Sequence, residues 1–477
     1  MMNQSRVAIA LALIFLSCGI ISCDNSGDPI VPPSQEDFSG MSWTEAFNSF
    51  HAKFSTEYPY TDWKGIDWEA LRSEYLPQIE AAEVTNDQEA YLTALRGYIF
   101  SIPDGHIMVL GDAMTSLIEQ HTAGGFGMCI TGLDDGSAIV NLVIADGPAD
   151  EAGIEAGAGI TQWNGMPIAE ALSQVDLLWR QSYSPIATDE LETIERYRYL
   201  TRAPVGTQVD VTFQNEGEIL SQTVNLMAVA DDNSTLSKAN FAAPADMSTV
   251  VSYEILSSGY GYLKLTYEPN DWSAFEDFKT AIQYFVDADV PALIIDIRGN
   301  RGGSDDMAAA FSGFFYQSSS FYEYQDFYNT LTGQFAIGIQ DESGAVTPGG
   351  SLMITPRPPS FSKKVVALVN PGTISSGEGV AMGIGRAPLG QVVGFYGTNG
   401  SFGMVGNGVL MPPWIEVGFP YGRSLDETGT IQLDSKNGIG GVAPTIRVPL
   451  TKESAIAFAN GDDPELSYAI EWLEANP

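Results

Sequence analysis

The sequence predicts a multidomain α+β protein, with helices first, a β-rich stretch next and an α/β domain at the end. A chain of 477 residues is too long for one hydrophobic core. Apolar residues recur at helical spacing near the start, whereas short β-branched runs alternate with amphipathic segments after about residue 250. We therefore expect a helical domain over 41–112, a β-rich domain over 116–229 and an α/β domain over 245–477.

The charge balance excludes some partners. The chain carries 60 acidic and 22 basic residues, which gives a formal net charge of −38. Such a surface repels nucleic acids and anionic membranes. We therefore expect no nucleic-acid partner.

The first 23 residues have the features of a secretory signal. Arg6 precedes an apolar stretch, 7–21, that is short for a spanning helix and ends just before Cys23. This ending resembles a bacterial lipobox, which implies lipidation of Cys23; Cys18 is a weaker candidate. Residues 24–40, rich in Pro and Ser, then form a tether. The expectation is an exported bacterial lipoprotein, periplasmic or at the cell surface, that contacts the membrane only through its anchor.

The remaining cysteine, Cys129, sits in an apolar stretch. Without a second thiol it cannot form an intrachain disulfide, and a buried structural role is favoured over catalysis.

Helical periodicity runs from Met41 to Ile102, with Asp67 and Asn86 as expected N-caps of the last two helices. The last helix leads into the turn Ile102–His106, and 107–110 reads as a strand. Of the three histidines, His106 alone sits where a rigid turn can present a catalytic group. A plain turn histidine is the alternative.

The stretch 124–226 follows the order of motifs in a PDZ domain and resembles one. Gly125, Phe126, Gly127 and Met128 resemble the carboxylate-binding loop of that family. A short helix at 148–153, a hairpin turn at 164–165 and a helix over about 168–178 come in the expected order. A PDZ domain binds an extended peptide at a sheet edge, so the resemblance implies polypeptide binding.

Residues 365–379 read as a buried strand, a sharp turn and a helix that opens with small residues. A hydroxyl delivered there would stand clear of the sheet, and the helix amides would face any oxyanion. The alternative is an ordinary Ser or Thr N-cap. For the aromatic segment 321–335 two roles remain open: packing in the core, or lining a peptide-binding cleft.

Five features occur in the order found in one peptidase family. They are 104–106 (DGH), the PDZ-like stretch, 296–303 (DIRGNRGG), 370–379 (NPGTISSGEG) and 440–444 (GGVAP). Over residues 43–473 the chain resembles the C-terminal processing peptidases, and more closely their tricorn-core-like branch. The resemblance implies a crotonase-like α/β catalytic domain.

The family's nucleophile lies three positions before the glutamate of a Ser-x-x-Glu pattern. This assigns Ser375 as nucleophile and Glu378 as the supporting glutamate, with Ser376 as the rival. The amide of Ser376 would form half of the oxyanion hole, and Gly302 or Gly303 the other half.

The base is expected to be His106. The processing peptidases use a Ser/Lys dyad, but no lysine occurs between Lys364 and Lys436. The tricorn-like branch takes a histidine from an Asp-Gly-His-like turn, which matches His106, with Asp104 in support.

The acid is expected at Asp434, 59 positions after Ser375 (434 − 375). Members of the branch usually carry Glu there, and Asn437 is a rival. Thr445 replaces an Asp common after the GGVAP proline, which affects packing more than chemistry.

Together these features predict a serine endopeptidase that cleaves polypeptides through an acyl-enzyme, without metal or organic cofactor. Two alternatives stay open: a peptide- or ligand-binding protein on the same scaffold, and a cell-surface adaptor that acts through its PDZ-like domain. The sequence does not set the oligomeric state.

Overall fold

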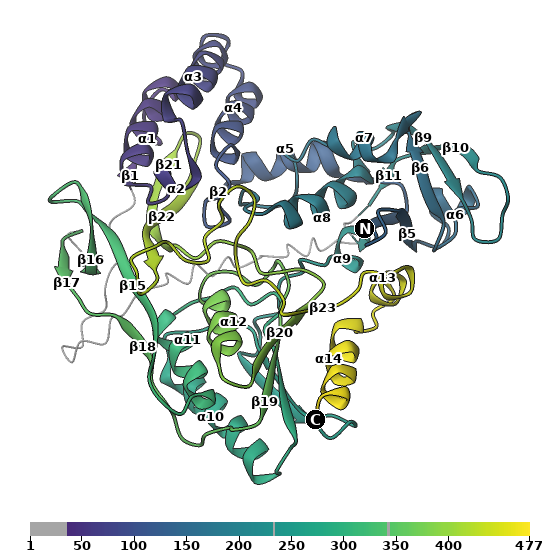
Figure 1. Cartoon of the computed structure of the whole chain (residues 1–477). Coiled ribbons are helices and arrows are strands. Elements are labelled where there is room, and N and C mark those ends of the chain that lie inside the picture. Colours follow the sequence, from purple (N-terminus) through teal and green to yellow (C-terminus); the bar gives the residue numbers. More distant parts are fainter. Residues whose placement is uncertain (1–35, 232–233, 341–343) are drawn as a thin grey trace, which may run out of the picture.

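The computed structural model describes residues 36–231, 234–340 and 344–477. The predicted signal segment, Cys23 and most of the expected tether lie outside the described residues. Figure 1 shows the N-terminal helices at one end of the molecule, the β-rich region at one side, and the α/β region below them with the C-terminal helices along its flank. The mixed α+β, multidomain character predicted from the sequence is confirmed.

Four helices lie near the start of the described part of the chain: α1 (Trp43–Glu57), α2 (Thr61–Lys64), α3 (Trp68–Thr85) and α4 (Gln88–Phe100). Asp67 caps α3 as predicted, with its carboxylate accepting from the amide of Ala70. The prediction for Asn86 was wrong. Asn86 ends α3 in the left-handed region, φ 52°, which asparagine tolerates, and Asp87 caps α4 instead.

A distant hairpin completes the N-terminal core. Phe50 and Phe54 of α1 are fully buried, and the ring of Phe54 lies 4.7 Å from that of Phe419. Phe419 belongs to β22 (Ile415–Leu425), which pairs with β21 (Met404–Met411). Because short helices cannot bury both faces alone, the region predicted as a separate domain shares its core with the C-terminal third of the chain.

The β-rich region is built around one twisted sheet in the order β10-β9-β6-β5-β4. Its elements are α5 (Asp112–Thr122), β4 (Met128–Gly132), β5 (Ala138–Val143), α6 (Pro148–Glu151), β6 (Gly159–Trp163), β7 (Met166–Pro167), α7 (Ile168–Ser173), α8 (Asp189–Leu200), β9 (Gln208–Gln214) and β10 (Gln222–Met227). The predicted turn at Asn164 and Gly165 joins β6 to β7, with φ of 52° and 74°. The predicted helix at 168–178 ends earlier, at Ser173.

A small sheet lies beside this one. Its order is β11-β3-β8, and the strands are β11 (Val229–Ala230), β3 (Gly124–Gly125) and β8 (Arg202–Ala203). The first glycine of the predicted peptide-binding loop, Gly125, therefore lies in the middle strand.

The α/β region has a six-stranded sheet in the order β12-β13-β14-β19-β20-β23. The strands are β12 (Val251–Ile255), β13 (Gly261–Leu265), β14 (Ala292–Asp296), β19 (Lys364–Leu368), β20 (Gly390–Gly394) and β23 (Ile446–Arg447). The helices of this region are α9 (Ser234–Lys238), α10 (Trp272–Asp287), α11 (Asp305–Ser312), α12 (Ser376–Arg386), α13 (Lys452–Ala459) and α14 (Pro464–Ala475). Since β14 and β19 are parallel and Asp296 pairs with Leu368, the loops that follow both strands leave the sheet at the same edge.

A second large sheet projects from the α/β region (Figure 1). Its order is β1-β21-β22-β15-β16-β17, with β18 on β15 and β2 on β22. The strands not yet given are β1 (Glu36–Asp37), β2 (Met108–Leu110), β15 (Ser320–Asn329), β16 (Gln334–Gln340), β17 (Val346–Pro348) and β18 (Leu352–Ile354). The aromatic segment 321–335 forms β15 and the start of β16, and Tyr322, Phe327 and Tyr328 are buried, which favours the core role for these rings.

Candidate active site

Ser375 stands at the junction between the nucleophile strand and helix. It occupies the N-cap position of α12, but its side chain makes no capping hydrogen bond. Its backbone has φ 61° and ψ −137°, a conformation that costs a non-glycine residue about 1–3 kcal/mol. The alternative of an ordinary N-cap is therefore not what the structure shows. A partly buried hydroxyl held on a strained strand-to-helix turn is the arrangement of a nucleophile elbow.

The neighbouring hydroxyl, on Ser376, is committed elsewhere. Ser376 is 1% exposed, and its Oγ donates to the carbonyl of Gly303 at 3.0 Å and lies 2.9 Å from Oδ1 of Asp305. Burial raises the pKa of Asp305 to about 7. Ser376 thus connects the start of α12 to the glycine-rich turn that follows β14, residues 297–303. The hydroxyl of Ser375 is less constrained than that of Ser376.

The glycine-rich turn lies against Ser375. A Cβ on Gly302 would sit 2.4 Å from the Cβ of Ser375, so only glycine permits this approach. The amide of Gly302 already donates to Oδ1 of Asn300 at 2.8 Å. Within the described residues, the amides of Gly303 and Ser376 donate no hydrogen bond. The amides of Gly303 and Ser376 are therefore available as donors, one on each side of the Gly302–Ser375 contact.

The turn that carries His106 is fixed by its own first residue. Asp104 is fully buried; its carboxylate accepts from the amide of His106 at 2.8 Å and from the hydroxyl of Tyr58 at 2.7 Å. Burial raises the pKa of Asp104 to about 6, and the charge of Asp434 acts in the same direction. Asp104 supports the turn and does not bond to the imidazole.

The imidazole of His106 has one ring nitrogen in use. Nδ1 accepts from the amide of Gly403 at 3.2 Å, and the buried Nε2 has no hydrogen-bond partner among the described residues. Burial lowers the pKa of His106 to about 4; the Asp434 carboxylate opposes this shift and the Lys64 ammonium adds to it. His106 is accordingly neutral at neutral pH, which a general base requires.

One loop connects the two groups. The amide of Ser375 donates to the carbonyl of Ser401, whose hydroxyl accepts from the amide of Gly105, next to His106. Gly403, two positions on, contacts Nδ1 of His106. Ser375 and His106 are therefore brought to the same loop, although no hydrogen bond joins their side chains within the described residues.

Glu378 holds this loop in place. Its buried carboxylate accepts from the hydroxyl of Thr398 and from the amides of Gly400 and Ser401. Burial raises the pKa of Glu378 to about 8, and these three hydrogen bonds act in the opposite direction. The supporting role expected for Glu378 thus has a concrete form, because it organises the loop between Ser375 and His106.

Asp434 is buried near His106 but is bonded to other groups. Its Oδ1 lies 2.7 Å from the ammonium of Lys64, and its Oδ2 accepts from the amide of Phe402 at 2.9 Å. Both side chains of the ion pair are almost completely inaccessible, 1% for Lys64 and 0% for Asp434. Within the described residues no hydrogen bond joins Asp434 to His106.

The other residues considered for this region lie apart from the chemistry. Asn437 is exposed in a left-handed turn with φ 52°. Thr445 accepts from the amide of Val392 and so joins the end of the chain to β20, a packing contact.

The four residues of the predicted peptide-binding loop are buried. Phe126 and Met128 are each 1% exposed and pack in the core of the β-rich region. Gly125 pairs with Arg202 on one side and with Val229 on the other. The sheet beside this loop nevertheless ends in β4, which pairs with β5 alone.

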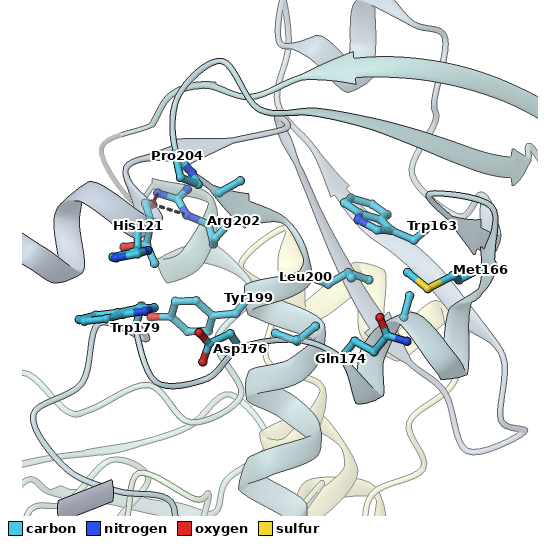
Figure 2. A pocket seen from close by; sticks show the side chains of 14 residues that line it. His121, Trp163, Met166, Gln174, Asp176, Trp179, Tyr199, Leu200, Arg202 and Pro204 are labelled. Atoms are coloured by element: carbon cyan, nitrogen blue, oxygen red, sulfur yellow. Dashed lines mark hydrogen bonds between the residues drawn. The ribbon is translucent and has the colours of Figure 1, made fainter. Parts of the chain in front are cut away.

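A separate pocket lies within the β-rich region, between the end of α5 and residues of β6, α7 and α8. Figure 2 shows it, with His121 stacked on Trp179 at 4.2 Å and Trp163 and Met166 on the opposite wall. Its volume is about 340 Å³, and none of the predicted site residues lines it.

The part of the chain that the structure describes holds no cluster of three or more His, Cys, Asp or Glu side chains suited to a metal ion. Cys129 is buried, and burial raises the pKa of its thiol to about 12. Among the described helices, none has the length and apolar character needed to cross a bilayer.

Comparison with known proteins identifies the family. The profile of peptidase family S41 matches residues 259–448, and that of the tricorn protease C1 domain matches residues 40–88. The two matches support assignment to the tricorn-like S41 peptidases, with the S41 peptidase domain over residues 259–448. The chain is a serine-type peptidase, a hydrolase, and the family acts on polypeptides.

Solved structures show the same fold over nearly the whole chain. Mature CPAF complexed with lactacystin is 13% identical, with a TM-score of 0.59, and the match covers 91% of this chain and 97% of that one. A second crystal structure of mature CPAF is 15% identical, with a TM-score of 0.60, and the match covers 90% of this chain and 95% of that one. No curated protein sequence matches the chain.

Sequence reasoning missed the residues that join distant segments of this S41 peptidase. Lys64, Asn300 and Ser401 each hold a site segment in place, yet only Asn300 lies in a recognisable motif. A lysine in a short helix carries no local signal that its partner lies 370 positions away (434 − 64).

Proposed function

We propose that this peptidase cleaves internal peptide bonds through an acyl-enzyme on Ser375, with His106 as general base and then general acid. The observation that carries the proposal is the setting of Ser375: a strained turn, a hydroxyl that caps nothing, and Gly302 pressed against its Cβ. Ser375 Oγ would attack the carbonyl carbon while His106 takes its proton. The same proton then passes to the leaving amine.

The oxyanion would be held by the amides of Gly303 and Ser376. Gly302 is the poorer donor because its amide already bonds to Asn300. Gly302 instead provides the close approach, and Gly303 is exposed where a substrate carbonyl could reach it.

Asp434 is proposed as the acid that selects the working tautomer of His106. Because Nδ1 accepts from Gly403, the ring proton of the neutral imidazole sits on Nε2 in this arrangement. For Nε2 to accept a proton from Ser375, the ring proton must move to Nδ1 and face an acceptor. The carboxylate of Asp434, whose charge already acts on His106, supplies that acceptor once it turns from Lys64.

The domain assignments complete the proposal. The β-rich region is proposed to be PDZ-like, with β4 as the edge at which an extended polypeptide adds a strand beside Gly125–Met128. The α/β region is proposed to be crotonase-like. A signal segment over 1–23 and acylation of Cys23 would make the protein an exported, membrane-anchored lipoprotein of a bacterium, with the tether placing the enzyme away from the bilayer.

The test is cleavage of a defined mixture of unstructured polypeptides, read by mass spectrometry of the products. New internal termini from the wild type, absent with Ser375→Ala, would support an endopeptidase. Binding without products would instead favour the binding protein, an interpretation supported by the pairing of Asp434 with Lys64 rather than with His106.

A further inference from the structure

The side chain of one arginine next to the proposed oxyanion hole has no partner among the described residues. Arg301 is exposed, and within the described residues its side chain makes no hydrogen bond, ion pair or ring contact. Each other arginine of the described chain makes at least one such contact: Arg72, Arg96, Arg180, Arg196, Arg198, Arg202, Arg298, Arg357, Arg386, Arg423 and Arg447. Arg301 is therefore the one arginine of the described residues whose guanidinium is not engaged by another group of the chain.

The position of Arg301 places it within reach of the substrate. It directly precedes Gly302, whose Cβ position lies 2.4 Å from the Cβ of Ser375. With about 3.8 Å between successive Cα atoms, the Cα of Arg301 lies within about 8 Å of that carbon. An extended polypeptide advances about 3.3–3.6 Å per residue, so a guanidinium starting there reaches residues that flank the scissile bond.

The carboxylates around this turn are already engaged. Asp305 bonds to Ser376, and Glu268 accepts from the side chain of Asn300. Burial raises the pKa of Glu268 to about 8 and that of Asp305 to about 7, which favours their neutral forms. Asp306 is exposed nearby but forms no ion pair with Arg301. The turn therefore presents a positive charge that its own carboxylates do not neutralise.

We propose that Arg301 is a specificity-determining residue that binds a carboxylate of the substrate polypeptide close to the bond that is cleaved. The guanidinium fork matches a planar carboxylate with two parallel hydrogen bonds, which an exposed arginine is suited to form. The carboxylate is supplied by an Asp or Glu side chain or by the free C-terminus of the substrate. This inference rests on the proposed role of Ser375.

The test uses quenched fluorescent peptides that share one cleavable sequence. One arm replaces each of the two residues on either side of the scissile bond by Glu or by Gln, and a second compares a free C-terminal acid with a C-terminal amide. Wild type should cleave the acidic member of the responsive pair with a kcat/KM about 10- to 100-fold higher, mainly through KM. The arm that responds identifies the source of the carboxylate.

Variants then assign the preference to the side chain. Arg301→Gln should abolish it, whereas Arg301→Lys should keep part of it, since the charge remains but the fork is lost. Arg447→Gln is the matched control: Arg447 is also exposed, pairs with Asp134 and gives the same change in net charge, so the preference should persist.

Equal cleavage of the acidic and neutral peptides by wild type, or a preference that survives Arg301→Gln, would overturn the inference. Labelling of the same proteins with an uncharged fluorophosphonate separates this failure from a wider one. If the wild type is labelled but shows no preference for acidic peptides, only the role of Arg301 is contradicted. If the folded wild type is not labelled, the proposed function is contradicted as well.

Discussion

The two halves of the proposed site are built differently. The nucleophile half is joined by short bonds between two loops that leave adjacent parallel strands: the amide of Ile374 donates to the carbonyl of Asn300, and the hydroxyl of Thr373 to that of Ile297. The base half gathers groups from the first helices, the His106 turn and the segment around Asp434. Local sequence therefore shapes the nucleophile, whereas the base depends on how distant segments pack.

This difference has an energetic side. The nucleophile half stores backbone strain at Ser375, which the surrounding hydrogen bonds must hold. The base half contains a buried ion pair between Lys64 and Asp434, and removing one partner of such a pair leaves a charge without compensation. Changes on the two sides should consequently separate activity from stability.

The largest effect is expected at the base. His106→Ala should lower kcat/KM by about 10²- to 10⁴-fold, because proton transfer from Ser375 would lose its acceptor. Peptide hydrolysis rates measure this, and circular dichroism checks the fold. His121→Ala, a histidine that stacks on Trp179 away from the site, should retain activity. An active His106→Ala enzyme would move the base elsewhere.

Breaking the ion pair should act mainly on stability. Lys64→Met is expected to lower the free energy of unfolding by about 3–5 kcal/mol, since the Asp434 carboxylate stays buried without its cation. Denaturant titration gives this value. Lys279→Met removes an exposed pair with Glu276 and should cost about 1 kcal/mol or less. Equal losses in both variants would contradict a special role for the buried pair.

Loosening the connecting loop should affect both halves. Glu378→Gln keeps the shape of the side chain but turns one acceptor into a donor that faces the amides of Gly400 and Ser401. We expect a loss of about 1–3 kcal/mol in unfolding free energy, and a fall in kcat larger than the change in KM. A change in KM alone would show that the loop serves binding rather than the placement of Ser375 and His106.

The smallest effect at neutral pH is expected from protonation of the base. A histidine acts as base only when deprotonated, and burial gives His106 a pKa of about 4 instead of the usual value of about 6.5. The kcat/KM of the free enzyme should therefore persist from pH 7 to pH 5 and fall as pH drops through about 4. If kcat/KM instead fell around pH 6.5 while circular dichroism showed an intact fold, His106 would be solvated in the working enzyme.

The sequence predicted the strand and turn that carry Ser375 well because they form one contiguous motif. The run from Val365 through Ser375 forms the strand and turn expected. Gly302, expected to let the backbone approach a substrate carbonyl, lies against the Cβ of Ser375. The sequence also predicted the helical start and the hairpin turn at Asn164.

What the sequence could not provide was long-range pairing. The ion partner of Asp434 and the closure of the N-terminal core by Phe419 depend on segments more than 300 positions apart. At the N-terminus of α4, Asn86 and Asp87 are both residue types that commonly cap helices. The left-handed backbone at Asn86, set by how α3 ends, decided for Asp87.

The central claim is that Ser375 is an activated nucleophile whose base is His106. Fluorophosphonate labelling of wild type, Ser375→Ala, Ser376→Ala and His106→Ala tests it directly. We expect labelling to be lost with Ser375→Ala, strongly reduced with His106→Ala and retained with Ser376→Ala, whose hydroxyl bonds to Gly303 and Asp305. Labelling that survives Ser375→Ala but disappears with Ser376→Ala would contradict it.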